Sequence, residues 1–287
     1  MGEPALSDWI GRVEEHAETV SPVTVNMLGA TLVEDWDAAS GTRAGAELPP
    51  LWHWGLFHQT VPLSEIARDG HPRLGRFLPP VALERRMWAG GRLTFHAALH
   101  VGERVHRRSE IRDITEKQGG AGRMVFVTVG HELHGEGGLA IEEEQDIVYI
   151  AMPDAYRPPK PKPAPEAPLF DERVAIDVVR LFRYSAATFN GHRIHYDLPY
   201  ATEVEKYPGL VVQGPMQATL LMGAAVRHKG SAPRRFSFRG VHPMFHTHDL
   251  RLMAVSAGDD ALELCTAAPR GDGNHQGLQA RAEWGPA

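Results

Sequence analysis

Hydrophobic and polar residues alternate in two tracts that occupy similar places in the two halves of the chain. The tracts cover residues 92–101 and 235–244, and they open with Arg-Leu-Thr-Phe and Arg-Phe-Ser-Phe. Alternation with a period of two is typical of strands that bury one face. Each tract is followed by a longer strand-forming segment, a Gly-Leu step and a last strand. These later strands are predicted at residues 124–129 and 147–150 in the first half and at residues 261–266 and 278–284 in the second.

An apolar segment with a proline near its start lies upstream of each strand set, and both segments are predicted to be helices. Pro80 stands before residues 81–88, and Pro215 stands before residues 216–227. Proline suits the first turn of a helix, because its missing N–H would be unpaired there. The second segment carries Met, Leu, Ala and Gly on several sides, so we expect it to be buried. A helix followed by antiparallel strands, occurring twice, indicates two α+β units.

A proline-rich segment divides the 287-residue chain nearly in half. Between Pro153 and Pro168 there are seven prolines with interleaved lysines. Such a density of proline excludes both the interior of a helix and a strand ladder, and it favours an extended spacer. The sequence therefore predicts a first unit at residues 1–152, a linker at residues 153–168 and a second unit at residues 169–287.

Composition narrows the class of protein. A hydrophobic content of 43% with 23% charged residues is ordinary for a globular protein, and the net charge of −6 gives no support to a nucleic-acid role. Cys265 is the only cysteine, so a disulfide within the chain and a Cys-rich zinc site are excluded, and we expect a buried structural thiol. The first residues do not resemble a signal peptide, and no apolar run approaches the ~18 residues of a membrane span. We expect a cytoplasmic protein that does not associate with membranes.

A polar, His-rich loop shortly before the second helix carries the candidate chemistry. Asn190 and His195 lie in this loop, and the helix opens with Gly214-Pro215. The start of a helix presents unpaired N–H groups and a positive dipole end, which can bind a thioester oxygen as it gains enolate character. An imidazole can move a proton between water and carbon near neutral pH. Each feature alone is ordinary in a loop or at a helix start, but together they are the minimum set of groups that hydration of an α,β-unsaturated thioester needs.

The same residues carry a family resemblance. The segment Phe189–Asp197, followed by Gly209–Pro215, resembles the hydratase signature of the MaoC-like hotdog superfamily, in its branch of type 2 hydroxyacyl-thioester dehydratases. The first half resembles the degenerate N-terminal hotdog of that branch through residues 49–54, 86–92 and 144–149. The resemblance spans nearly the whole chain. It implies an α+β double hotdog, in which two tandem units join their sheets side by side and each sheet wraps around a central helix.

The resemblance also implies roles for single residues. His195 matches the catalytic histidine, and Gly214 matches the glycine whose backbone N–H meets the thioester oxygen. The family usually has an aspartate five residues before the histidine, where this chain has Asn190. An amide cannot exchange a proton as a carboxylate does, but it can hold a water molecule through hydrogen bonds. Whether Asp197 orients the imidazole or faces solvent is left open.

Arginines are the expected partners for the phosphates of coenzyme A or for a carboxylate of the substrate. Arg85, Arg86, Arg234 and Arg235 are candidates, and Trp52 and Trp54 are more readily interpreted as packing residues. The predicted substrate-binding residues are Arg193, Arg239, Tyr184, Trp52, Trp88 and Arg92.

No metal site is expected. His242, His246 and His248 would share one face of a strand-like tract, and His131 and His134 would flank a turn. Without a supporting carboxylate pattern, these histidines are interpreted as polar residues of a sheet face or a turn rather than as ligands.

The leading function is hydration of a short, branched dicarboxylic enoyl-CoA, because within the branch the chain is most similar to hydratases of mesaconyl-CoA or itaconyl-CoA, which interconvert these with citramalyl-CoA. A (3R)-hydroxyacyl-thioester dehydratase of fatty acyl chains is the alternative in the same class. An acyl-CoA thioesterase and a non-catalytic acyl-CoA binding module are alternatives of other classes. The expected partner is the acyl-CoA itself, with coenzyme A as part of the substrate and no separate cofactor. Assembly into a homo-oligomer is left open.

Overall fold

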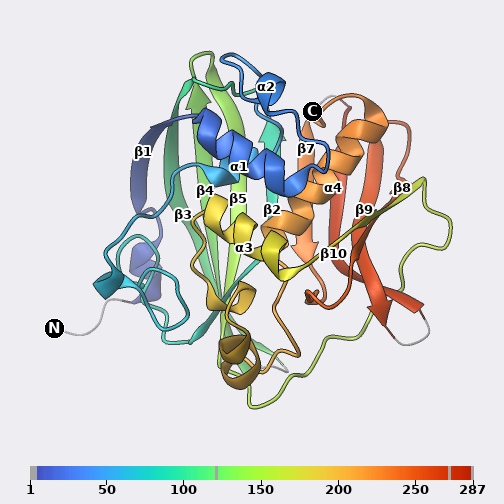
Figure 1. Ribbon diagram of the computed structural model, residues 1–287. Helices are drawn as coiled ribbons and strands as arrows, with labels where there is room; N and C mark the ends of the chain where they lie inside the picture. The colour runs from blue at the N-terminus through green and yellow to red at the C-terminus, as the bar shows by residue number, and fades with distance from the viewer. Residues whose placement is uncertain (1–4, 120–121, 271–272, 286–287) are drawn as a thin grey trace.

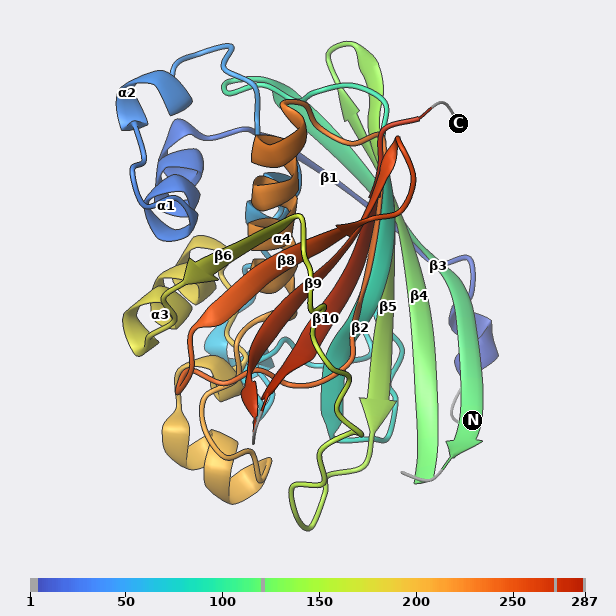
Figure 2. The ribbon, with the colours of Figure 1, turned by 90° about the vertical axis from the view of Figure 1, so that its right-hand side faces the viewer.

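One antiparallel sheet collects the strands of both halves. The computed structural model describes residues 5–119, 122–270 and 273–285, and its strands form a 10-stranded sheet in the order β1-β3-β4-β5-β2-β7-β10-β9-β8-β6. Figure 2 shows these strands side by side, with the helices on one face of the sheet. The strands are β1 (Val13–Thr19), β2 (Arg85–Phe95), β3 (Arg104–Gly119), β4 (Gly122–Gly135), β5 (Gly138–Ile150), β6 (Phe170–Val174), β7 (Arg235–Gly240), β8 (Leu250–Ser256), β9 (Ala261–Arg270) and β10 (Gly273–Glu283).

The sheets of the two halves join between β2 and β7. These strands pair antiparallel from Gly90↔Arg239 to Thr94↔Arg235. A Cβ atom on Gly90 would lie 2.5 Å from the carbonyl oxygen of Phe238, so only glycine allows this close approach of the two backbones. The predicted α+β double hotdog with its sheets side by side is confirmed.

Four α-helices and several short helical turns cover the concave face of the sheet (Figure 1). No helix within the described ranges has both the length and the apolar character needed to cross a lipid bilayer. The helical elements are α1 (Pro22–Leu32), α2 (Ala38–Gly41), α3 (Val178–Ala187), α4 (Gly214–Lys229), the 3-10 turns η1 (Leu6–Trp9), η2 (Trp52–Gly55), η3 (Leu63–Glu65) and η4 (Arg193–His195), and the π-helical turn η5 (Tyr200–Val204).

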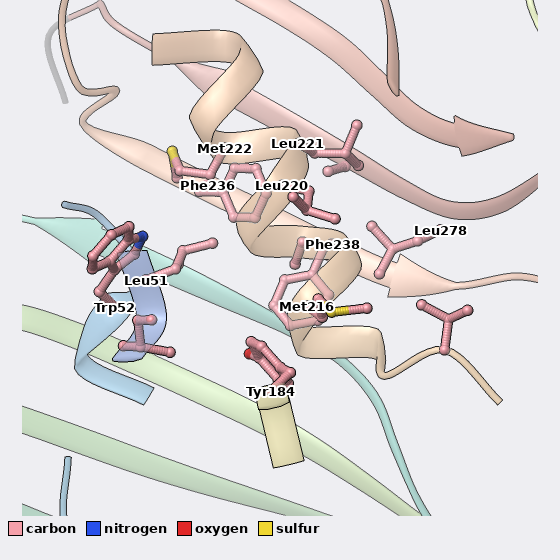
Figure 3. Close-up of a cluster of buried hydrophobic side chains, with 14 of the residues drawn as sticks. Leu51, Trp52, Tyr184, Met216, Leu220, Leu221, Met222, Phe236, Phe238 and Leu278 are labelled. Atoms are coloured by element: carbon pink, nitrogen blue, oxygen red, sulfur yellow. The ribbon is translucent and has the colours of Figure 1, made fainter. Parts of the chain in front are cut away.

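Helix α4 is the predicted buried central helix. Pro215 lies in its first turn, and Gly230 ends it in a left-handed conformation with φ of 76°. It contacts β8, β9 and β10. Leu51 and Trp52 of the first half share one buried cluster with α4 and with Phe236 of β7 (Figure 3). The hydrophobic core is therefore continuous across both halves of the chain.

The predicted helix at residues 81–88 is wrong, because residues from Arg85 onward form β2. The residues from Arg85 to Trp88 pair with Ile150 to Ile147 of β5, and these sheet hydrogen bonds outweigh a weak local helix preference. The helix of the first half is α1 instead. Proline occupies its first turn, and the Ser21 side chain caps it by accepting a hydrogen bond from the N–H of Val23.

The strand predictions hold in part. Residues 124–129 lie in β4 and residues 261–266 in β9, as predicted, and Cys265 of β9 is buried. The tract predicted to open at Arg92 is instead the end of β2, which stops at Phe95. The second tract starts at Arg235 as predicted, but β7 stops at Gly240. The two last strands are parts of the longer strands β5 and β10.

The histidines considered for metal binding are placed differently from the prediction. The chain leaves the sheet after β7, so His242, His246 and His248 do not share a strand face. His246 Nδ1 instead accepts a hydrogen bond from a backbone N–H at 3.1 Å. His131 and His134 belong to β4 rather than to a turn, because β4 continues through the predicted turn.

The proline-rich segment lies between the two halves as irregular chain. Residues 151–169 contain neither helix nor strand, apart from the isolated bridge Pro163↔His275. Proline density explains this conformation. The division into units at residues 1–152 and 169–287 stays a prediction, and the shared core and joined sheet show that the two halves fold against each other.

Candidate active site

A cavity of about 650 Å³ lies between the two halves. One wall is the inner face of β3, β4 and β5, which contributes Arg107, His131 and Glu143. The opposite wall comes from α3 and the loop that follows it, which contribute Ser185 and Asn190. Its volume is in the range of binding sites for small molecules and cofactors.

The loop after α3 turns sharply at the predicted catalytic motif. Phe189 adopts a left-handed conformation with φ of 50°. The side-chain oxygen of Asn190 accepts a hydrogen bond from the backbone N–H of His192 at 3.0 Å. The backbone N–H of Asn190 donates to the carbonyl of Ser185 at 2.8 Å. An Asn side chain that accepts from the backbone two residues on is a standard way to reverse a chain. Asn190 thereby faces the cavity and leaves its amide NH₂ group available as a donor.

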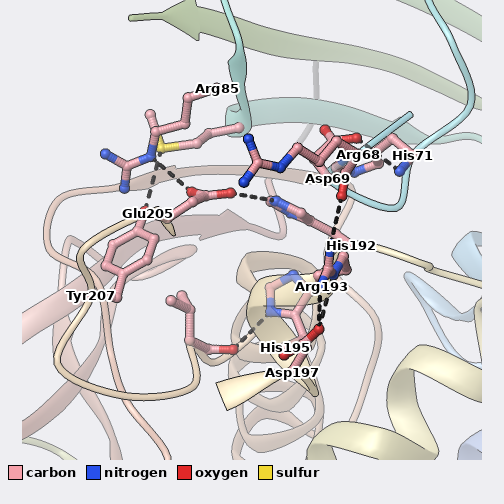
Figure 4. A network of polar contacts seen from close by, with 12 residues as sticks. Arg68, Asp69, His71, Arg85, His192, Arg193, His195, Asp197, Glu205 and Tyr207 are labelled. Carbon is pink, nitrogen blue, oxygen red and sulfur yellow. Dashed lines mark hydrogen bonds and ion pairs between the residues drawn. The ribbon is translucent and has the colours of Figure 1, made fainter. Parts of the chain in front are cut away.

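His195 follows in the turn η4 and is 7% exposed. Its Nδ1 lies 2.7 Å from the carbonyl oxygen of Val211 (Figure 4). A carbonyl can only accept, so Nδ1 carries the proton and Nε2 presents a lone pair. The N–H of Val211 donates to the Ile194 carbonyl at 3.0 Å, which holds Val211 against the turn.

The surroundings of His195 keep its imidazole neutral. Burial is the largest cause, and the neighbouring His192, whose ring centroid is 5.3 Å away, adds to it. Together they lower the pKa of His195 to about 3. At neutral pH the ring is therefore an uncharged proton acceptor.

Gly214 is the first residue of α4, and its backbone N–H is one of the donors that a helix start leaves without an intrahelical partner. The preceding Gln213 donates its side-chain amide to the Leu181 carbonyl and to Ser185 Oγ, which fastens the start of α4 to α3. A Cβ atom on Gly214 would meet only the Trp88 carbonyl oxygen, at 4.0 Å. Because Trp88 and Ser185 line the cavity, the start of α4 adjoins it.

A chain of polar groups surrounds His192 and was not predicted. His192 Nε2 lies 3.3 Å from the Glu205 carboxylate, and Glu205 is 3.1 Å from the Arg85 guanidinium. On its other side, the His192 ring is 4.3 Å from that of His71, which is bound to Asp69 at 2.8 Å (Figure 4). The only indication in the sequence was that His192 lies inside the segment Phe189–Asp197, which carries the family resemblance. Nothing in the local pattern of residues 69–71 indicated that they would lie there.

Asp69, His71 and His192 are the residues of the described ranges whose arrangement could hold a metal ion, since each offers a ligand atom within 4.8 Å of the others. Asp69 is already bound to His71, and His192 to Glu205, so each carboxylate has a partner without an ion. The expectation that the protein holds no metal stays a prediction.

Asp197 and Arg193 bind each other rather than His195 or the cavity. Arg193 Nη2 lies 2.7 Å from the Asp197 carboxylate, which also accepts from the N–H of Tyr200. Arg193 further donates to the carbonyl of Arg68 in the first half. The imidazole of His195 is oriented by the Val211 carbonyl. Asp197 therefore does not have the orienting role that the sequence left open for it.

The other predicted substrate contacts are scattered. Trp88 lines the cavity. Tyr184 and Trp52 are buried in the core, and Arg239 is bonded to Gln279 at 2.9 Å on an exposed part of the sheet. Arg92 pairs with Glu144 and Asp146 and lines a separate cavity of about 410 Å³. Of the predicted site residues, Asn190 and Trp88 line the cavity, Gly214 lies beside Trp88, and His195 lies in the turn after Asn190 but is not among the lining residues.

Sequence reasoning also missed a polar group on the inner face of the first sheet. Glu143 is 3% exposed and accepts hydrogen bonds from Trp54 at 2.9 Å and from Gln145 at 2.8 Å, and its second oxygen lies 3.0 Å from His53 Nε2. Burial would raise the pKa of Glu143, but its bond to His53 and its other partners outweigh burial and lower the pKa to about 2. The available signal was the spacing of two between Glu143 and Gln145, which places both on one face of a strand.

Asn190→Ala is expected to lower turnover by on the order of a hundredfold, because it removes both the turn-forming acceptor and the free NH₂ donor. Asn190→Asp should retain a measurable fraction, since its carboxylate keeps the acceptor for the His192 N–H and restores the commoner family residue. Steady-state kinetics of both variants provide the measurement. An Ala variant more active than the Asp variant would contradict the role given to this side chain.

Known proteins of one family are similar to this chain in sequence. The family model of hydroxyacyl-thioester dehydratase type 2 matches residues 51–246. A mesaconyl-C(4)-CoA hydratase of Chloroflexus aurantiacus is 45% identical over 257 residues, covering 88% of this chain and 89% of that protein. The mitochondrial hydroxyacyl-thioester dehydratase type 2 of Schizosaccharomyces pombe is 26% identical over 238 residues, covering 74% and 79% of the two chains.

Solved structures agree on the fold. A MaoC-like dehydratase superposes with a TM-score of 0.70 at 15% identity, covering 98% of this chain and 100% of the other. A Mycobacterium tuberculosis protein described as a double hotdog superposes with a TM-score of 0.61 at 16% identity, covering 97% of each chain. The match of the family model over most of the chain, together with 45% identity to a hydratase, shows that this chain belongs to the type 2 hydroxyacyl-thioester dehydratase family and is a hydro-lyase with a double hotdog fold.

Proposed function

We propose that the protein hydrates the double bond of a short, dicarboxylic enoyl-CoA thioester. Mesaconyl-CoA or itaconyl-CoA is the proposed substrate, and citramalyl-CoA is the product. The observation that carries this proposal is a neutral imidazole, His195, in the same loop as the cavity-lining Asn190 and beside the open start of α4. The 45% identity to a mesaconyl-C(4)-CoA hydratase supports the acyl group.

Each group has a defined part in the reaction. The N–H of Gly214 and the positive end of α4 polarise the thioester carbonyl. The NH₂ group of Asn190 donates to the oxygen of a water molecule, and His195 Nε2 accepts one of its protons. The water oxygen then bonds to the β-carbon while the thioester oxygen gains negative charge. The imidazolium of His195 returns the proton to the α-carbon, and dehydration is the same sequence in reverse.

The low pKa of His195 suits this sequence of steps. A buried imidazolium is costly on its own, but the transition state places an enolate close to it. The charge on His195 is therefore favoured only while the thioester oxygen is negative. This favours rapid return of the proton to carbon.

A panel of purified acyl-CoA thioesters tests the function. We expect mesaconyl-CoA or itaconyl-CoA to lose its enoyl-thioester absorbance without release of free thiol, and to react faster than crotonyl-CoA. Release of thiol would identify a thioesterase. Faster hydration of crotonyl-CoA and longer enoyl chains would identify a fatty-acyl hydroxyacyl-thioester dehydratase. Binding without turnover of any substrate would identify a non-catalytic module.

A further inference from the structure

The inner face of the first sheet is polar where it meets the cavity. Ser109 of β3, His131 of β4 and Glu143 of β5 lie opposite one another in neighbouring strands, and Arg107 lies two residues before Ser109 on the same face. Arg107, His131 and Glu143 line the same cavity as Asn190. A cavity wall that meets only an alkyl chain would be apolar, so the polar side chains indicate a polar ligand group.

Arg107 carries the charge that this wall offers to a ligand. Its side chain is 17% exposed, and its Nε has no hydrogen-bond partner among the described residues. The Glu14 carboxylate is 3.8 Å from its Nη2, which is beyond hydrogen-bond distance, and the guanidinium lies 4.6 Å from the centroid of the Phe57 ring. Glu18 is nearby and binds the N–H of Phe57. Arg107 is therefore a largely buried cation that lies in the field of Glu14, Glu143 and Glu18, but no described carboxylate is within hydrogen-bond distance of it.

The other groups of the wall leave room for an anion. The two oxygens of Glu143 are already engaged by Trp54, Gln145 and His53. Burial and Arg107 are among the causes that lower the pKa of His131 to about 4, so its ring is neutral at physiological pH. His131 Nδ1 is 2.8 Å from Ser109 Oγ, and its buried Nε2 is not hydrogen-bonded to any residue that the structure describes. Because the hydroxyl can donate to Nδ1, Nε2 can carry the proton and donate to a ligand.

The loop that contains Phe57 connects this wall to the reacting end of the cavity. Phe57 covers Arg107, and the adjacent His58 binds the Ala187 carbonyl at 3.2 Å and contacts the ring of Phe189. Asn190 is the next residue after Phe189 in the sequence. An acyl group with its thioester near Asn190 can therefore point its far end towards Arg107.

We propose that Arg107, assisted by His131 Nε2, binds the free carboxylate of a dicarboxylic acyl-CoA and so selects this class of substrate. The inference rests on the proposed function and deepens it. A guanidinium grips a carboxylate through two parallel bonds, and burial strengthens that pairing. Arg193 and Arg239, the arginines predicted for this role, are instead bound to Asp197 and Gln279.

Arg107→Met tests the proposal, with Arg108→Met as the matched control. Arg108 is the next residue of β3, on the opposite face of the strand, where it binds Glu110. We expect Arg107→Met to lower kcat/KM for mesaconyl-CoA by on the order of a hundredfold, mainly through KM, and to leave crotonyl-CoA within a few-fold. Arg107→Lys should recover part of the loss. Arg108→Met should leave both substrates unchanged, and retained crotonyl-CoA turnover shows that the variant is folded.

Binding of saturated analogues separates this inference from the proposed function. Calorimetry compares methylsuccinyl-CoA with butyryl-CoA, neither of which can be hydrated. Wild-type preference for methylsuccinyl-CoA that disappears in Arg107→Met supports the proposal. The same preference unchanged in Arg107→Met overturns the role of Arg107 while the dicarboxylic substrate stands. No preference in the wild type, together with faster hydration of crotonyl-CoA than of mesaconyl-CoA, overturns both.

Discussion

Replacing His195 with alanine is expected to lower turnover by on the order of a hundred- to ten-thousand-fold, which is the usual contribution of a general acid–base group. The Val211 carbonyl fixes the tautomer of His195, so Nε2 is the atom that takes and returns the proton. The His192 ring, 5.3 Å away, is bound to Glu205 and does not have the same fixed tautomer. We therefore expect no neighbouring histidine to substitute for it.

The measurement is steady-state hydration of the best substrate of the panel by His195→Ala and by a control, His106→Ala. His106 is an exposed histidine of β3 that faces away from the cavity. The control should be fully active. Activity of His195→Ala within a few-fold of wild type would show that the reaction uses another base.

The pH dependence of the same assay should be unusual for a histidine enzyme. The pKa of His195 is lowered from an ordinary value of 6.5 to about 3, so the neutral form persists as pH falls through 6.5. We expect kcat/KM to show no loss with a midpoint near 6.5 between pH 8 and 5. Because the unfolded state does take up a proton below 6.5, the buried ring instead lowers the stability of the fold as pH falls towards 3. A loss of kcat/KM with a midpoint near pH 6.5 would argue against a buried, neutral His195.

Removing the first half is expected to abolish both solubility and activity. A fragment that starts at Pro168 would lose the β2–β7 pairing and would leave the edge of β7 unpaired. It would also expose the part of α4 that shares a core with Leu51 and Trp52. The cavity itself would disappear, since Arg107, His131 and Glu143 form one of its walls.

Size-exclusion chromatography and the hydration assay check this result. The matched control is the full chain with a protease site in the irregular segment at residues 157–162. Cleavage there should leave the two halves associated and active, because the joined sheet and shared core do not depend on the linker. A monodisperse fragment 168–287 with wild-type activity would show that the second half is an independent enzyme.

Local sequence was sufficient for the elements whose signals lie within a few residues. The helix α4 is set by Pro215 in its first turn and Gly230 after its last, and both act through their own backbone. The segment Phe189–Asp197 carried the family, and its Asn190 forms the turn with its own loop. Residues 261–266 were predicted as a strand-forming segment and lie in β9.

Tertiary structure decided what depends on partners far along the chain. Residues 85–88 were predicted as helix, but pairing with β5 makes them strand, since the hydrogen bonds of a sheet come from distant segments. The protonation state of His195 depends on Val211, 16 residues later, and on burial by the whole fold. Arg107 could not be singled out from the other arginines by its neighbours in sequence. Only the folded chain shows that Arg193 and Arg239 have partners while the Nε of Arg107 has none beside the cavity, because burial and pairing are properties of the assembled sheet.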